Sequence, residues 1–158
     1  MIDYPKYKKV LFCTDFSIIS DCAFDYAFGI AKRDEAVLYI LHIITPRPEP
    51  DILRLHLTDE QMDKVEADHQ EYLEKMFNNK YLNHIKDKTK VKIVTLSGRE
   101  DDKIIEFVQE EKIDILVIGT CGRTGMEHVL LGSVAEKVIR RSPIPVFVIP
   151  CKDKTDPS

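Results

Sequence analysis

Five short apolar runs recur along the chain, separated by longer stretches in which apolar and polar residues follow a helical period. The runs carry apolar residues at consecutive positions, which is typical of strands that are buried on both faces of a sheet. Their lengths fit strands better than helices. We therefore expect strands at residues 8–15, 36–44, 90–96, 114–119 and 145–149.

Four segments between these runs have the periodicity of amphipathic helices. They are residues 20–33, 58–82, 99–112 and 133–141. Ser20 is available as the N-cap of the first, and Thr58 or Asp59 as the N-cap of the second. The third has acidic residues in its first turn, where the helix dipole favours them. The expected apolar faces of the first three helices are Ala23, Ala27, Ile30 and Ala31; Met62, Val65, Tyr72 and Met76; and Ile104, Ile105 and Val108.

Strands that alternate with helices in this way indicate a single-domain α/β fold, a five-stranded parallel sheet with helices on both faces. Right-handed crossovers leave few possible strand orders. The order 3-2-1-4-5 places the end of the first strand, "CTD", beside the end of the fourth, "GTCG". In such sheets, ligands bind outside the carboxyl ends of the strands, at the point where the strand order reverses.

The composition is that of an ordinary soluble globular protein. Of 158 residues, 44% are apolar and 32% are charged, and the net charge is −4 with no basic stretch. This balance argues against nucleic acid and anionic membrane surfaces as partners. The apolar runs are too short to cross a bilayer, and the N-terminus has no signal-peptide core.

The number and spacing of the cysteines indicate the cellular compartment that we expect for the protein. The four cysteines form no C-x-x-C pair, which argues against a zinc site and against a disulfide framework. We therefore expect a reducing, cytoplasmic environment. The cysteines are Cys13, Cys22, Cys121 and Cys151.

Four of the six glycines lie between positions 119 and 132, after the fourth strand and before the last helix. Glycine permits positive φ and lets a ligand approach the backbone closely. We expect Gly119 and Gly122 to form a tight turn, and Gly132 and Ser133 to open a helix whose unpaired N–H groups suit phosphate. The Ser133 hydroxyl can cap that helix or donate to a phosphate oxygen, and Arg123 would add positive charge.

Other phosphate-binding patterns are absent from the chain. It has no G-x-x-x-x-G-K-[ST] and no G-x-G-x-x-G after the first strand, which excludes a Walker-type NTPase and a dinucleotide fingerprint. A lone G-x-x-G is more often a simple turn with a tight helix–strand contact. The full spacing, at the switch point and ending at a helix start, favours a phosphate site.

These segments resemble the universal stress protein family, in its ATP-binding branch. The matching segments are "KKVLFCTDFS", "LHII" and the stretch from "SGREDD" to "PVFVIP". The family's loop pattern, G-x-x-G-x₉-G-[ST], is intact as Gly119, Gly122, Gly132 and Ser133. The resemblance implies a Rossmann-like, adenine nucleotide alpha hydrolase-like domain over residues 1–150, with a flexible tail at residues 151–158.

The resemblance also implies an ATP site, residue by residue. Asp15 would lie near the ribose and phosphates, and the backbone at Ile43 would meet the adenine edge. The base and ribose would be lined by Cys13, Thr14, Ile118 and Gly119. The triphosphate would be surrounded by Gly122, Arg123, Gly132, Ser133, Val134 and Ala135. Mg²⁺ would be held mainly by the phosphate oxygens.

Several of these residues also have a purely structural interpretation. Asp15 can cap the following helix, which is compatible with a ligand role, and His42 is interpreted as a packed core histidine. Cys121 sits in the glycine-rich loop, where a lowered thiol pKa would suit redox sensing, but a small residue that merely fits is the simpler explanation. Glu66 and His69 form one Glu-x-x-His, whereas a di-iron site needs two such motifs.

No catalytic residue is identified. The chain has no apparent Ser-His-Asp arrangement and no H-x-G-H motif of related nucleotidyl transferases. We interpret the chain as an ATP-binding stress-response or signalling module with at most slow ATP hydrolysis. The alternatives are a nucleotide-free dimeric scaffold, or a true ATPase or adenylyl-transferring enzyme of related fold.

The fifth strand is expected to form the interface of a homodimer. It is short, apolar and last in the strand order, so it presents an open edge that invites pairing. Antiparallel pairing with its own copy would give a closed two-fold dimer through Val146–Ile149, and the resemblance points the same way. The alternative is an edge covered by the C-terminal tail, whose sequence "KDKTDPS" has little to bury.

Overall fold

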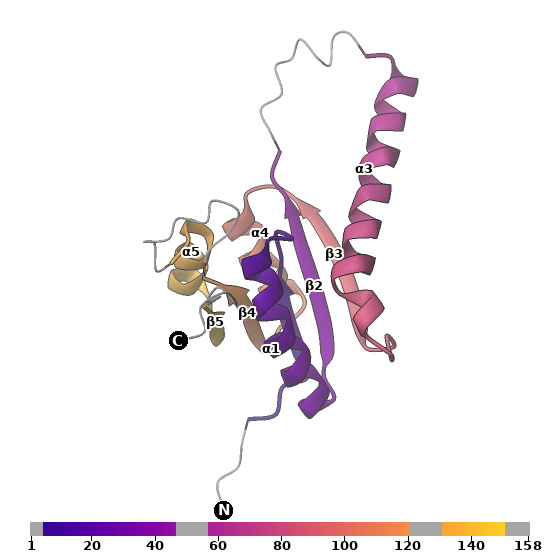
Figure 1. Ribbon diagram of the computed structural model, residues 1–158. Helices are drawn as coiled ribbons and strands as arrows, with labels where there is room; N and C mark the ends of the chain where they lie inside the picture. The colour runs from indigo at the N-terminus through magenta and orange to yellow at the C-terminus, as the bar shows by residue number, and fades with distance from the viewer. Residues whose placement is uncertain (1–4, 47–56, 121–130, 151–158) are drawn as a thin grey trace, which may run out of the picture. The chain divides into compact units, whose positions relative to one another are not determined.

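The computed structural model describes residues 5–46, 57–120 and 131–150. The chain divides into two compact units. One comprises Met1–Thr45 and Thr89–Ser158, and the other comprises Pro46–Lys88. All five strands belong to the first unit (Figure 1).

The sheet has the predicted strand order. Its strands are β1 (Lys9–Cys13), β2 (Val37–Ile44), β3 (Val91–Ser97), β4 (Ile115–Gly119) and β5 (Val146–Ile149). They form one five-stranded sheet in the order β3-β2-β1-β4-β5, and every neighbouring pair is parallel. The predicted α/β fold class and order are therefore confirmed, with strand ends displaced by at most two residues.

Helices pack on both faces of this sheet. Helix α1 (Ile18–Asp34) packs on one face, where Phe24 contacts Phe12 of β1 with ring centroids 5.5 Å apart. Helices α4 (Glu100–Glu110) and α5 (Ser133–Arg141) share a buried apolar cluster with the opposite side chains of the strands. Ile104, Ile105 and Val108 belong to the core, as expected.

Helix α1 begins three residues earlier than predicted. Its N-cap is Ser17, whose hydroxyl accepts a hydrogen bond from the Ser20 amide. Ser20 is therefore inside the helix, and its assignment as the N-cap was wrong. The physical reason is that "DFS" forms its own hydrogen-bonded turn, described below, which places Ser17 rather than Ser20 at the first position with extended dihedral angles.

The second unit contains helix α3 (Asp59–Lys80) and the 3₁₀ turn η1 (Leu82–His84). Thr58 caps α3 as predicted, in a capping box with Gln61. The expected apolar face was wrong. Met62, Val65 and Tyr72 are exposed, whereas the helix buries Leu73 and Phe77. The first turns of α3 are mostly polar, so burial is confined to its last turns, where these two residues recur at the i, i+4 spacing.

Asp34, at the end of α1, forms an ion pair with Arg33 and a hydrogen bond with the segment that leads into β1. The Asp34 carboxylate accepts hydrogen bonds from the Tyr7 amide at 3.0 Å and from Arg33 Nε at 2.7 Å. Its side chain is only 8% exposed. The hydrogen bonds from Arg33 and from the Tyr7 amide lower the pKa of Asp34 to about 2.

This pKa gives a prediction for acid stability. Because the folded pKa of Asp34 is lowered, its contribution to stability is present above the unfolded value of about 3.9 and is lost as the pH falls towards 2. Asp34→Asn should lower the free energy of unfolding at neutral pH and flatten its decline between about pH 4 and pH 2. Urea unfolding at a series of pH values measures this. A variant with the wild-type pH slope would contradict the assignment.

Candidate functional site

The two predicted strand ends meet at the carboxyl edge of the sheet. Phe12 of β1 is in register with Val117 of β4, so the residues that follow them, Cys13 and Ile118, also lie next to each other. On the other side of β1, Cys13 is in register with Leu41 of β2. The Thr14 amide then donates to the Leu41 carbonyl at 2.9 Å, which extends this pairing beyond the strand.

One backbone hydrogen bond joins the two ends of the glycine-rich segment, and another joins its start to β5. The Thr120 amide donates to the Ile149 carbonyl of β5 at 3.0 Å, and the Gly132 amide donates to the Thr120 carbonyl. These two bonds bring the start of α5 against the end of β4. Gly122, Arg123 and Cys121 lie outside the described residues, so the predicted turn through Gly122 stays a prediction.

Helix α5 starts at this position with a glycine as its N-cap. Gly132 has φ −70° and ψ 156° and makes no side-chain cap bond to the helix start. Ser133 is the first residue inside the helix and is exposed, so the expectation that its hydroxyl can cap the helix was wrong. The first amides of a helix have no intrahelical acceptor and carry partial positive charge. A helix start of this kind is suited to an anion.

The turn between β1 and α1 is closed by its own side chains. The Ser17 amide donates to Asp15 Oδ1 at 3.0 Å, and the Phe16 amide donates to Thr14 Oγ1 at 2.9 Å. Phe16 adopts the left-handed region, at φ 61°, which is uncommon for a bulky residue and is typical of functional turns. Asp15 therefore stabilises the turn that leads into α1, and the residue is partly exposed.

His42 is a packed histidine, as interpreted from the sequence. It is 6% exposed, and its ring lies 4.5 Å from the Phe16 ring, centroid to centroid. Its Nδ1 is 2.9 Å from the Thr14 carbonyl oxygen. Because a carbonyl only accepts, Nδ1 carries the proton of this bond. His42 thus holds the end of β1 and the left-handed turn in place.

The predicted binding residues fall into two groups according to the burial of their side chains. Cys13, Ile43, Ile118 and Ala135 have side chains in the core cluster, and Val134 packs against it. Thr14 is buried, and its hydroxyl also bonds to that of Ser20. These residues can offer a ligand their backbone, whereas Asp15, Gly132 and Ser133 are partly or fully exposed at the same edge.

Gly119 packs closely against helix α1. A β-carbon built there would lie 3.0 Å from the Ile19 carbonyl oxygen and 3.2 Å from Ile19 Cγ2. The first turn of α1 therefore packs directly on the end of β4. The tight helix–strand contact considered as the simpler explanation of the glycines is present at this position.

Cysteine chemistry differs from the expectation. Cys13 is a free thiol whose burial raises its pKa, so it is poorly reactive at neutral pH. Cys22 is disulfide-bonded, and the prediction of a chain without disulfides was wrong. Sequence spacing alone does not reveal which cysteines the fold brings within bonding distance.

Two further observations concern metals and membranes. Within residues 5–46, 57–120 and 131–150, no group of three or more His, Cys, Asp or Glu side chains could hold a metal ion. This includes Glu66 and His69, which are exposed on α3. No helix in this described part is long and apolar enough to span a bilayer.

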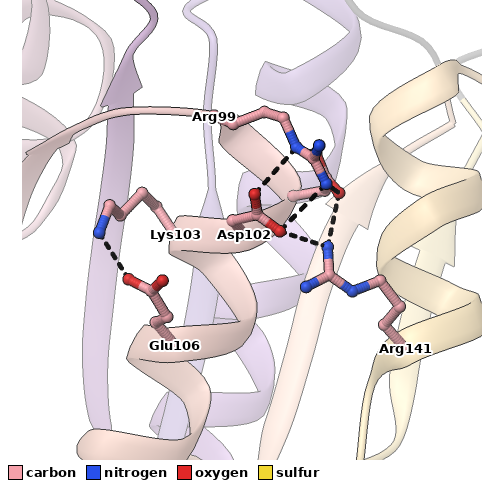
Figure 2. A network of polar contacts seen from close by, with 6 residues as sticks. Arg99, Asp102, Lys103, Glu106 and Arg141 are labelled. Atoms are coloured by element: carbon pink, nitrogen blue, oxygen red, sulfur yellow. Dashed lines mark hydrogen bonds and ion pairs between the residues drawn. The ribbon is translucent and has the colours of Figure 1, made fainter.

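One set of charged residues was not anticipated. Arg141, the last residue of α5, reaches the first turn of α4. There it pairs with Asp101 at 2.6 Å and Asp102 at 2.7 Å, and both carboxylates also bind Arg99 (Figure 2). Sequence spacing gives no signal for this contact, because forty positions separate Arg141 from Asp101.

Comparisons with known proteins identify relatives along nearly the whole chain. Residues 6–150 match the model of the Universal stress protein family. Universal stress protein MJ0531 of Methanocaldococcus jannaschii is 34% identical over 145 residues, covering 90% of this chain and 82% of that protein. Universal stress protein MJ0577 of the same organism is 33% identical over 159 residues, covering 93% of this chain and 97% of the relative.

Solved structures agree with this result. A structure of MJ0577 superposes with a TM-score of 0.73 at 27% identity, over 95% of this chain and 100% of that one. A universal stress protein solved in complex with cAMP superposes with a TM-score of 0.64 at 26% identity, over 92% of this chain and 98% of that one.

The contact at Gly119 gives a prediction with an internal control. Gly119→Ala places a methyl group against the Ile19 carbonyl, which should destabilise the fold by about 1–3 kcal/mol. Gly29→Ala, in the middle of α1 with nothing within 4 Å of the new β-carbon, should stabilise it by roughly 0.5–1 kcal/mol. Chemical denaturation measures both variants. Equal stabilities for the two would show that α1 does not constrain position 119.

Proposed function

The chain belongs to the universal stress protein family, and on this premise we propose that it binds an adenine nucleotide, ATP, at the carboxyl edge of the sheet. One observation carries the proposal: the start of α5, with Gly132 as its N-cap, is bonded through Gly132 and Thr120 to the end of β4, beside the end of β1. The relative solved in complex with cAMP supports the same ligand class. We propose an adenine-nucleotide-dependent stress or signalling module.

The proposed roles follow from the burial of each residue. The first amides of α5, with Ser133, bind phosphate. The backbone near Cys13, Thr14, Ile118 and Gly119 lines the base and ribose, and the Ile43 backbone meets the adenine edge. Asp15, already turned towards the Ser17 amide, lies on the ribose and phosphate side. Mg²⁺ is held mainly by phosphate oxygens, because this ion keeps most of its bonds to phosphate and water in such sites.

Slow hydrolysis at most is proposed, because His42, the one histidine at this edge among the described residues, already bonds to Thr14 and is buried.

The two alternative functions predict different experimental results. A nucleotide-free scaffold would release no nucleotide when the purified protein is denatured. A true ATPase or adenylyl-transferring enzyme would form product at steady turnover. A cytoplasmic location and a domain spanning residues 1–150 stay predictions.

The nucleotide site is tested at Gly132. Its φ of −70° and ψ of 156° are open to any residue, so Gly132→Ala and Gly132→Val should fold while filling the space in front of the helix start. ATP affinity should fall in the order Gly, Ala, Val, and the Val variant should show no binding by calorimetry. Circular dichroism provides the folding control. A folded Gly132→Val variant with wild-type affinity would place the phosphates elsewhere.

A homodimer through β5 is the second part of the proposal. In the described sheet β5 pairs with β4 on one side only. Phe147 is 42% exposed and meets Tyr26 of α1, itself 52% exposed, edge to face at 6.0 Å. An exposed apolar edge strand of this kind invites pairing with a second copy.

Sedimentation tests the dimer. Phe147→Lys combined with Val148→Pro should convert a dimer into a monomer, because the charge and the lost N–H oppose strand pairing. Phe147→Lys alone should weaken the dimer while leaving the backbone bonds to β4 intact. Ile93→Lys is the matched control, since Ile93 is 40% exposed on β3, at the opposite edge. A wild-type monomer at micromolar concentration, or a folded double variant that remains dimeric, would exclude this interface.

A further inference from the structure

The start of α4 and the end of α5 are joined by four charged side chains. Arg99 binds Asp101 through two parallel hydrogen bonds of 3.0 Å, from Nε and Nη2. Arg141 Nη1 donates to Asp101 Oδ2 at 2.6 Å and to Asp102 Oδ1 at 2.7 Å. Figure 2 shows Asp102 between the two arginines, Arg99 from the turn before α4 and Arg141 from α5.

Asp101 is the buried centre of this network. Its side chain is 4% exposed, whereas that of Arg141 is 41% exposed and that of Asp102 is 36% exposed. Burial raises the pKa of Asp101, but the hydrogen bonds and charge of Arg99 outweigh that effect, and the pKa lies below its usual value. A buried carboxylate requires charged partners to remain ionised. Arg141 is the residue of α5 that hydrogen-bonds to Asp101, and the charge of Lys137 on the same helix also lowers the pKa of Asp101.

Helix α5 is held against α4 by charged as well as apolar contacts. Of its nine residues, Ala135 and Val138 are buried, and Val134 packs against the same core cluster. Arg140, its other C-terminal arginine, pairs with Glu136 of the same helix. The two ion pairs of Arg141, with the buried Asp101 and the partly exposed Asp102, therefore contribute to holding the C-terminal end of α5 against α4.

The same helix presents the proposed phosphate site at its other end. Ser133 and Arg141 are its first and last residues, about 12 Å apart at 1.5 Å per residue. A helix this short moves as a rigid rod, so a shift of its C-terminal end also moves the amides of its first turn. Electrostatic stabilisation of a phosphate is sensitive to displacements of this kind.

We propose that Arg141 is a positioning residue for the phosphate-binding end of α5, acting through its ion pairs with Asp101 and Asp102. This inference rests on the proposed nucleotide function. Arg141 touches no ligand itself. It sets the place of the helix start relative to the end of β4, and so contributes to the binding of phosphates and not to the binding of the base.

Loss of the Arg141 contacts and general destabilisation of the fold would affect ligand binding differently. Without Arg141, Asp101 keeps both hydrogen bonds from Arg99, so α4 retains its paired first turn. The contacts that are lost are those that hold α5. Arg141→Gln should therefore weaken a ligand that carries phosphates and leave adenosine binding nearly unchanged, whereas general destabilisation would weaken both ligands together.

The experiment compares ATP and adenosine binding by calorimetry in the full chain. Arg141→Gln should raise the Kd for ATP roughly tenfold and change that for adenosine by less than about twofold. Arg141→Lys, which keeps the charge but not the forked geometry, should give an intermediate Kd for ATP. Arg140→Gln is the matched control, one position away and confined to its own helix, and should bind both ligands as the wild type does.

Several outcomes would overturn the inference. They are an unchanged ATP affinity in folded Arg141→Gln, an equal loss for ATP and adenosine, or an equal loss in Arg140→Gln. Should Arg141→Gln fail to fold, Asp102→Ala removes one carboxylate that accepts from Arg141 and should weaken ATP binding in the same direction, and wild-type affinity in that variant would refute the role. A wild-type chain that binds neither ligand refutes the proposed function itself, and the inference with it.

Discussion

Parallel pairing between β1 and β4 places the polar end of β1 beside the glycine-rich end of β4, although the two are far apart in the sequence. Parallel strands need a crossover at each connection, and α1 follows the carboxyl end of β1 as α5 follows that of β4. The starts of α1 and α5 are therefore gathered at the edge where β1 and β4 end. His42 reinforces this edge, because it bonds to the Thr14 carbonyl and packs on Phe16.

The electrostatics of α5 connect this edge with the rest of the helical layer. A helix carries partial positive charge at its start and partial negative charge at its end. Here the N-cap is Gly132, and the end carries Arg141, which binds two carboxylates at the start of α4. The charged groups thus complement both helix ends that meet there.

The fold was predictable from the sequence because its elements depend on local patterns. Consecutive apolar residues marked the five strands, and Thr58 with Gln61 marked the start of α3. The candidate site was proposed from the spacing of Gly119, Gly132 and Ser133, and the structure joins the two ends of this segment at the edge of the sheet. What could not be predicted was the use of each side chain. Ser20 was expected as an N-cap, and Ser133 as a cap or a donor to phosphate, and both lie inside their helices.

By itself, the sequence determined the class of fold and the strand order and singled out the glycine-rich segment, because hydrophobic periodicity and glycine spacing are read over neighbouring positions. Only the tertiary structure decided the packing of His42 on the left-handed turn at Phe16, the contact of Gly119 with Ile19, and the pairing of Arg141 with Asp101. Each of these joins segments from different elements. Its energy depends on distances across the fold, which local sequence does not encode.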